Sequence, residues 1–179
     1  LRRMAREYRI ERYLSIVEEI RAKVDDVVIS TDVIVGFPGE TEEDFEATLQ
    51  ACEAAAFEQA YMFMYSARPG TPSYKHFADM PREVKVERLQ RLIERQKARS
   101  LAAHEALIGR DVRVLLKDLG RDSRYAVGHS DQNHTVLVPA ESVTRMGLAQ
   151  VRVTAATPHA LYGELKDAAA PGIALMMAS

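Results

Sequence analysis

The stretch "ISTDVIVGFPGETEEDFEATL", residues 29–49, decides the fold of the first half of the chain. Val27–Val35 is a short β-branched run, the pattern of a strand covered on both faces. Phe37-Pro38-Gly39-Glu40 then fits a type II turn, with proline second and glycine third. Thr41 is a suitable helix N-cap, and Asp44 follows as a weaker form of the capping-box acid. We therefore expect a strand, a sharp turn and a helix.

A second strand is expected at residues 60–66. It is followed by Arg68-Pro69-Gly70-Thr71, which repeats the Pro-Gly chemistry of the first turn. The apolar spacing of residues 7–24 predicts a helix before the first strand. Strand, helix and strand in this order predict a parallel sheet. Ligands of such sheets bind beyond the carboxyl ends of the strands, where both Pro-Gly turns are expected.

The rest of the chain predicts a long helix and an all-β segment. Pro81 opens the helix, which we expect to reach Leu107, with Gly109 as its stop. Lys and Arg outnumber Glu in this helix, and we interpret the excess as a solvated face. From residue 112 to residue 165 the apolar period changes to two, and five short strands are expected. A small antiparallel barrel is the natural closed arrangement.

Composition excludes several classes of protein. The 179 residues are 47% hydrophobic and 28% charged, and no apolar run approaches the length of a membrane span. The formal charge of −2 gives no global attraction to nucleic acid. The one cysteine, Cys52, excludes a disulfide framework and an iron–sulfur cluster, and indicates a reducing cytoplasm. The chain begins with Leu1, so we expect a piece of a longer protein.

Four acids gather at the first turn of the expected helix: Glu40, Glu42, Glu43 and Asp44. They disfavour a phosphate-binding loop, although helix N-termini usually attract phosphate. An amine, a cationic centre or ribose hydroxyls would fit better. Acids in a first turn also simply offset the helix dipole, and chemistry alone favours that interpretation.

The pattern Asp32-x-Ile34-x-Gly36-x-x-x-Glu40 resembles the motif at the fifth strand of radical S-adenosylmethionine (SAM) barrels, where the strand backs the adenine. The strings "STDVIVGFPGETEEDF" and "YSARPGTPSY", with the helix "MAREYRIERYLSIVEEIR", resemble the methylthiotransferases. Residues 109–165 resemble their terminal TRAM domain. The resemblance covers nearly the whole chain.

This resemblance implies an α/β fold with two domains. Residues 1–80 would form the C-terminal part of a TIM-like parallel βα barrel. Residues 81–108 would form a connecting helix, residues 109–167 an antiparallel all-β TRAM barrel that binds RNA, and residues 168–179 a disordered tail.

The arginine in "SARPGT" resembles the tRNA-modifying, MiaB-type branch. This implies that the complete parent is a cytoplasmic transferase, which adds a methylthio group to C2 of N6-isopentenyladenosine at tRNA position 37. The cofactors implied are SAM and two [4Fe-4S] clusters, the partner is tRNA, and the sulfur donor stays open. The alternatives are the sister branch, which methylthiolates an aspartate of a ribosomal protein, and a non-catalytic RNA-binding module.

The cysteines of the family are absent here. Neither its CxxxCxxC motif nor its N-terminal three-cysteine domain occurs in this sequence, and Cys52 is interpreted as a core residue. We therefore assign no catalytic residue and no metal ligand, and we expect this piece to be inactive alone.

The resemblance assigns two sets of binding residues. The cofactor set is Asp32, Ile34, Gly36, Glu40 and Arg68. Each has a structural alternative. For Ile34 it is packing within the strand, for Glu40 it is bracing of the turn, and for Asp32 and Arg68 it is an ion pair. The RNA set is Arg113, Lys117, Arg124, His134 and Arg152. For the histidine the alternative is an ordinary surface or core position.

Overall fold

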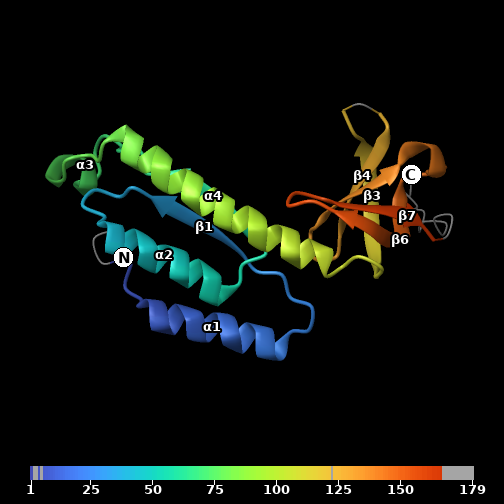
Figure 1. The fold of residues 1–179 in the computed structure, drawn as a ribbon, viewed down its shortest axis with the longest axis horizontal. Helices are drawn as coiled ribbons and strands as arrows, with labels where there is room; N and C mark the ends of the chain where they lie inside the picture. The colour runs from blue at the N-terminus through green and yellow to red at the C-terminus, as the bar shows by residue number, and fades with distance from the viewer. Residues whose placement is uncertain (2–3, 5, 122, 167–179) are drawn as a thin grey trace, which may run out of the picture. The chain divides into compact units, whose positions relative to one another are not determined.

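The computed structural model describes residues 1, 4, 6–121 and 123–166. The chain divides into two compact units, Leu1–Arg99 and Ser100–Ser179. The long helix α4 (Arg82–Glu105) contributes residues to both (Figure 1). The tail expected to be disordered, residues 168–179, lies outside the described residues. Among the described helices, none has the length and apolarity that a membrane span requires.

The first unit is a two-stranded parallel sheet with helices. Its other elements are α1 (Ile10–Lys23), β1 (Ser30–Val35), α2 (Glu42–Ala55), β2 (Gln59–Met64) and α3 (Pro72–His76). The two strands pair in parallel, with Ser30 opposite Gln59 and Val35 opposite Met64. Figure 1 shows α2 and α4 alongside β1. The predicted parallel βα arrangement is therefore confirmed for this pair of strands.

Helices cover one face of this sheet. Val33 and Val35 of β1 pack with Phe45 and Leu49 of α2 and with Leu92 of α4, because these apolar residues face one another across the layer. The prediction of a strand covered on both faces is wrong for the described chain. A β-branched run predicts a strand, but it does not reveal which of its faces finds a partner.

The other face of the sheet is open. Asp32 and Ile34 of β1 are exposed, although a strand covered on both faces would have buried them. Tyr61 and Phe63 of β2 are 57% and 49% exposed. They lie on the same uncovered face as Asp32 and Ile34.

The second unit contains a closed five-stranded barrel, as predicted. Its strands are β3 (Asp111–Leu119), β4 (Tyr125–Ser130), β5 (Thr135–Pro139), β6 (Gly147–Ala156) and β7 (Leu161–Leu165), with a 3-10 turn, η1 (Ala140–Ser142). The barrel closes in the order β3-β4-β5-β7-β6. One pair, β5 with β7, is parallel, so the expectation of a wholly antiparallel barrel is corrected. Alternating inward residues, most of them valine, form its core.

Candidate functional site

The two Pro-Gly turns lie side by side at the carboxyl ends of β1 and β2. The Tyr65 amide donates a hydrogen bond of 2.8 Å to the carbonyl of Val35, which extends the parallel pairing past both strands. The rings of Phe37 and Tyr65 meet edge to face, with centroids 5.0 Å apart. Residues from both turns therefore share one end of the sheet.

The turn after β1 has the geometry that its sequence predicts. The Glu40 amide donates to the Phe37 carbonyl at 2.9 Å, and Gly39 has a φ of +76°, as a type II turn requires. Thr41 and Asp44 form a complete capping box, each side chain accepting from the other's backbone amide. The first turn of α2 is therefore fixed by local hydrogen bonds.

Gly36 is a glycine for a reason internal to the chain. Its φ is +75°, and a Cβ placed on it would lie 2.3 Å from Cγ of Lys85. The resemblance assigns this glycine to the close approach of an adenine. In the structure, the buried side chain of Lys85 already occupies the space of a Cβ, so the glycine is needed whether or not a ligand binds.

Glu40 braces the turn. One oxygen of its carboxylate accepts hydrogen bonds from the Gly36 amide at 3.0 Å and from Nη1 of Arg88 at 2.6 Å. The side chains of Arg88 and Glu40 are only 6% and 11% exposed. Glu40 therefore has two partners within the chain, which agrees with the bracing alternative.

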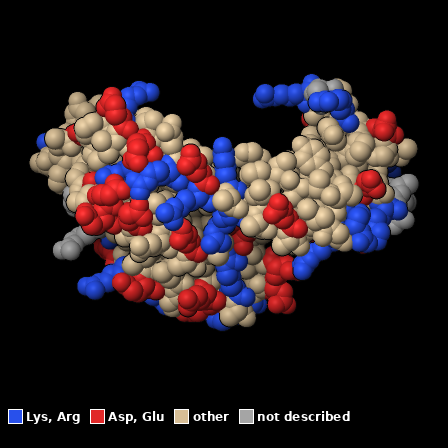
Figure 2. All heavy atoms as spheres, in the orientation of Figure 1, with Lys and Arg blue, Asp and Glu red and all other residues tan. Residues whose placement is uncertain are grey.

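The basic residues of α4 are not all on a solvated face, and that interpretation is corrected for two of them. Lys85 and Arg88 are buried, while Arg91 pairs with Glu42, Glu46 and Glu87. Figure 2 shows basic and acidic side chains interleaved over this part of the first unit. Of the four acids gathered at this turn, Glu40 and Glu42 thus pair with cations of α4. The Arg91 guanidinium holds the pKa of Glu42 below its ordinary value.

Sequence reasoning missed Lys85 and Arg88, although a signal was present. They share a helical face with Leu92 and Gln96, at spacings of three and four residues, and all four are buried. A cation in line with the apolar stripe of a helix predicts a buried ion pair, whereas the charge count of the whole helix does not.

The open face of β1 and β2 forms an apolar shelf with one carboxylate. Ile34 lies opposite Phe63 in the register, and Asp32 lies opposite Tyr61. Ile34 is 44% exposed, close to the value for Phe63, so both present apolar surface. Apolar side chains can cover the face of a purine, and a carboxylate can accept hydrogen bonds from hydroxyl or amino groups. These residues therefore fit a nucleoside.

Arg68 lies in the second turn, which is also built as predicted. The carbonyl of Arg68 accepts from the amide and the hydroxyl of Thr71, and Gly70 has a φ of +89°. The side chain of Arg68 is exposed. Within the described residues it forms no ion pair, so the alternative of a salt bridge gains no support.

The residues present do not fit an iron–sulfur cluster. Cys52 packs beside the cores of the first unit, and burial raises the pKa of its thiol. No group of three or more metal-ligating side chains occurs in the described part of the chain. No step involving a cluster can therefore be derived from this chain.

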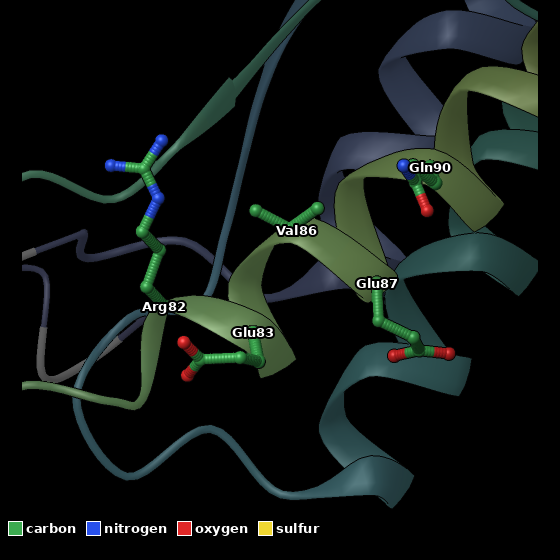
Figure 3. A pocket seen from close by; sticks show the side chains of 5 residues that line it. All are labelled: Arg82, Glu83, Val86, Glu87 and Gln90. Carbon is green, nitrogen blue, oxygen red and sulfur yellow. The ribbon is translucent and has the colours of Figure 1, made fainter.

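A hollow of about 310 Å³ lies beside the first turns of α4. Figure 3 shows that one helix alone supplies its labelled side chains: Arg82, Glu83, Val86, Glu87 and Gln90. None of them belongs to the sets that the sequence assigned.

Four members of the RNA set lie at the surface of the barrel. Arg113 pairs with Asp131 at 2.9 Å, and Arg152 donates to the Gly109 carbonyl and pairs with Asp111. Lys117, on β3, and Arg124, before β4, are exposed. Arg113 and Arg152 would have to exchange or share their carboxylates to bind phosphate.

His134 lies in the interior of the second unit, which corrects its placement on an RNA-binding surface. It is 4% exposed, and its Nδ1 lies 3.2 Å from Nε2 of His104. Nδ1 of His104 lies 2.6 Å from the Thr157 carbonyl, which can only accept. His104 therefore donates from Nδ1 to the carbonyl of Thr157.

Comparisons with known proteins point to one family. The model of the radical SAM superfamily matches residues 1–52. A tRNA-2-methylthio-N(6)-dimethylallyladenosine synthase of Thermus thermophilus is 54% identical over 171 residues, covering 96% of this chain and 37% of the relative. The synthases of Deinococcus radiodurans and Leifsonia xyli are 51% and 47% identical, each over 92% of this chain.

The chain spans about a third of the length of these curated relatives. Within that third, the match runs through both turns and through the closed barrel. The chain therefore belongs to the radical SAM methylthiotransferase family of the tRNA-2-methylthio-N(6)-dimethylallyladenosine synthases.

Proposed function

We propose that this chain is the C-terminal portion of a tRNA methylthiotransferase, which adds a methylthio group to C2 of N6-isopentenyladenosine at tRNA position 37. The observation that carries the proposal is the identity of 54% over 96% of the chain to a synthase named for this product. The rest of the enzyme would complete the TIM-like barrel and supply the cysteines for two [4Fe-4S] clusters.

The first unit would contribute one wall of the SAM site. Ile34 and Phe63 would cover a face of the adenine, and Asp32 would accept a hydrogen bond from the nucleoside. Gly36 and Glu40 would keep the end of β1 in place beside it. Arg68, exposed on the second turn, would bind a carboxylate or a phosphate through its guanidinium. When bound, SAM supplies the radical chemistry of the reaction.

The barrel of the second unit would hold tRNA by its backbone. Lys117 and Arg124 are exposed, and Arg113 and Arg152 could exchange their surface carboxylates for phosphates at modest cost, because exposed ion pairs contribute little. Neutralising phosphates in this way makes affinity depend on salt. This contact would be largely independent of base sequence.

The test is the activity of the complete enzyme that contains this chain. Reconstituted without oxygen and given SAM and isopentenylated tRNA, it should produce a nucleoside that is heavier by one methylthio group, detected by mass spectrometry. Unmodified tRNA together with a methylthiolated ribosomal protein would favour the sister branch. Binding of tRNA without either product would favour the non-catalytic module.

The barrel's part is tested separately by the affinity for tRNA at several salt concentrations. Lys117→Ala should weaken binding and make the salt dependence shallower by about one ion. Gln150→Ala, which alters an exposed uncharged residue of β6, is the matched control. An unchanged salt dependence for Lys117→Ala would exclude that residue from the RNA-binding surface.

A further inference from the structure

Helix α4 carries two buried cations on one face. Lys85 and Arg88 are 8% and 5% exposed, and their spacing of three residues places them together. Two buried charges are costly, and replacing such groups by apolar residues is often neutral or stabilising. Packing alone therefore does not explain why two charged residues are buried at these positions.

Arg88 holds the turn after β1. Its Nη1 donates to the Glu40 carboxylate at 2.6 Å and to the Glu40 backbone carbonyl at 3.0 Å. The same carboxylate oxygen accepts the Gly36 amide. Arg88 thus fixes both the side chain and the backbone of Glu40, and through them the direction in which the chain leaves β1.

Lys85 contacts the ends of both strands. Its methylene groups fill the space beside Gly36, at the end of β1. Its ammonium donates to the carbonyl of Tyr65, just after β2, at 3.3 Å, and to both oxygens of Asp79 at 3.0 and 2.8 Å. Asp79 lies between α3 and α4, so one side chain joins three segments of the first unit.

We propose that Lys85 and Arg88 are positioning residues, which set the ends of β1 and β2 so that the shelf of Ile34 and Phe63 accepts the adenosyl part of SAM. This inference rests on the proposed function. Neither cation reaches the open face of the sheet. They act through Gly36, Glu40 and the Tyr65 carbonyl, and small displacements of such supports weaken binding strongly.

The two cations have different tasks, which conservative variants can separate. Lys85→Met keeps an unbranched chain against Gly36 and removes the ammonium that holds Tyr65 and Asp79. Arg88→Lys keeps a buried positive charge for Glu40 and removes the rigid guanidinium whose Nη1 donates to both its carboxylate and its carbonyl. Both variants should fold, because each retains most of the volume of the original side chain.

The experiment measures the dissociation constant for SAM by equilibrium dialysis, on the complete reconstituted enzyme and below the melting temperature of each variant. We expect Lys85→Met and Arg88→Lys to weaken SAM binding by about tenfold or more, with unchanged affinity for tRNA. The matched control is Arg95→Ala on the same helix. Arg95 pairs with Glu53 in an exposed contact, away from both turns, so SAM affinity should change by less than about twofold.

The outcomes separate the two proposals. Wild-type affinity for SAM in both folded variants would overturn the inference and leave the proposed function intact. Loss of folding in both variants would also overturn it, since the cations would then serve stability alone. A wild-type enzyme that binds no SAM would overturn the proposed function and this inference together.

Discussion

Gly36 and Gly70 both have a positive φ but different surroundings. Their φ values are +75° and +89°, a region that disfavours side chains. A Cβ on Gly36 would overlap Lys85, whereas a Cβ on Gly70 would have no atom within 4 Å. The two positions therefore separate backbone strain from steric overlap.

We expect Gly70→Ala to lower the free energy of unfolding by about 1 kcal/mol through strain alone. Gly36→Ala should lower it by about 2–4 kcal/mol, because the buried lysine must also move. Urea denaturation of the chain, monitored by circular dichroism, measures the free energy of unfolding of each variant. Equal losses would show that Lys85 yields without cost.

A second prediction at the residue scale concerns Asp111. The Lys166 ammonium, with Arg152 nearby, holds the pKa of this carboxyl below its ordinary value. A carboxylate with a lowered pKa stabilises the folded state above its unfolded pKa, about 4, and loses this contribution as the pH falls through the folded value.

Wild type should therefore be more stable than Asp111→Asn near neutral pH, and the difference should shrink below about pH 4. Unfolding midpoints in urea across a pH series would measure it. Glu141→Gln is the control, because this exposed carboxylate has no cation partner among the described residues. A difference for Asp111→Asn that persists in acid would show that it comes from something other than charge.

Individual residues also show which features of the structure could be predicted from the sequence. The type II turn and the capping box at Thr41 follow from local chemistry, and both form as expected. The fate of Arg88 could not be deduced in this way, because its partner Glu40 is 48 residues away. Long-range pairing depends on which helix packs on which strand, and local patterns do not contain that information.

At the scale of elements, neighbouring strands of the barrel approach one another very closely at two places. A Cβ on Gly128 of β4 would lie 2.5 Å from the Leu115 carbonyl oxygen, and one on Gly163 of β7 would lie 2.5 Å from that of Arg152. Backbone atoms cannot step aside as a flexible side chain can. Closure therefore depends on small residues at two places in the barrel.

We expect Gly128→Ala and Gly163→Ala each to destabilise the barrel by about 1–3 kcal/mol, with a larger effect than their small change in volume suggests. The matched control on β7 is Glu164→Ala, at an exposed position, which should stay within about 0.5 kcal/mol. Hydrogen exchange of the amides of β3 and β6 would locate the loss. Full protection in both glycine variants would contradict the prediction.

The strands of the barrel were predictable because their alternation is regular and their turns are short. The parallel pairing of β5 with β7 was not, because period-two patterns state which residues face inward but not the direction of the neighbouring strand. In the first unit, the pattern likewise did not state which faces of the sheet are covered by helices. The run around Ile34 predicted a strand, and only its packing partners reveal that one face is open.

At the scale of the whole chain, the open sheet face is an apolar surface that water would contact. Ile34, Tyr61 and Phe63 are each more than 40% exposed, and within the described residues β1 and β2 pair only with each other. Exposed apolar surface and unpaired strand edges favour association between copies.

We expect the 179-residue chain to self-associate as its concentration rises, with a sedimentation coefficient that increases accordingly. Phe63→Ser should reduce this association and change stability by less than about 0.5 kcal/mol, since the side chain is half exposed. Leu148→Ser is the comparison, because Leu148 is 55% exposed on the barrel. An equal effect of both variants would show that the sheet face is not the surface involved.

The contact between Gly36 and Lys85 also has an evolutionary consequence. Because one residue has no side chain and the other fills the resulting space, neither position can change freely without the other. Sequences in which position 36 has acquired a methyl group should show a shorter or differently branched residue at position 85. Positions 36 and 85, which are far apart in the chain, would then covary among related sequences. Local motifs do not reveal such a constraint.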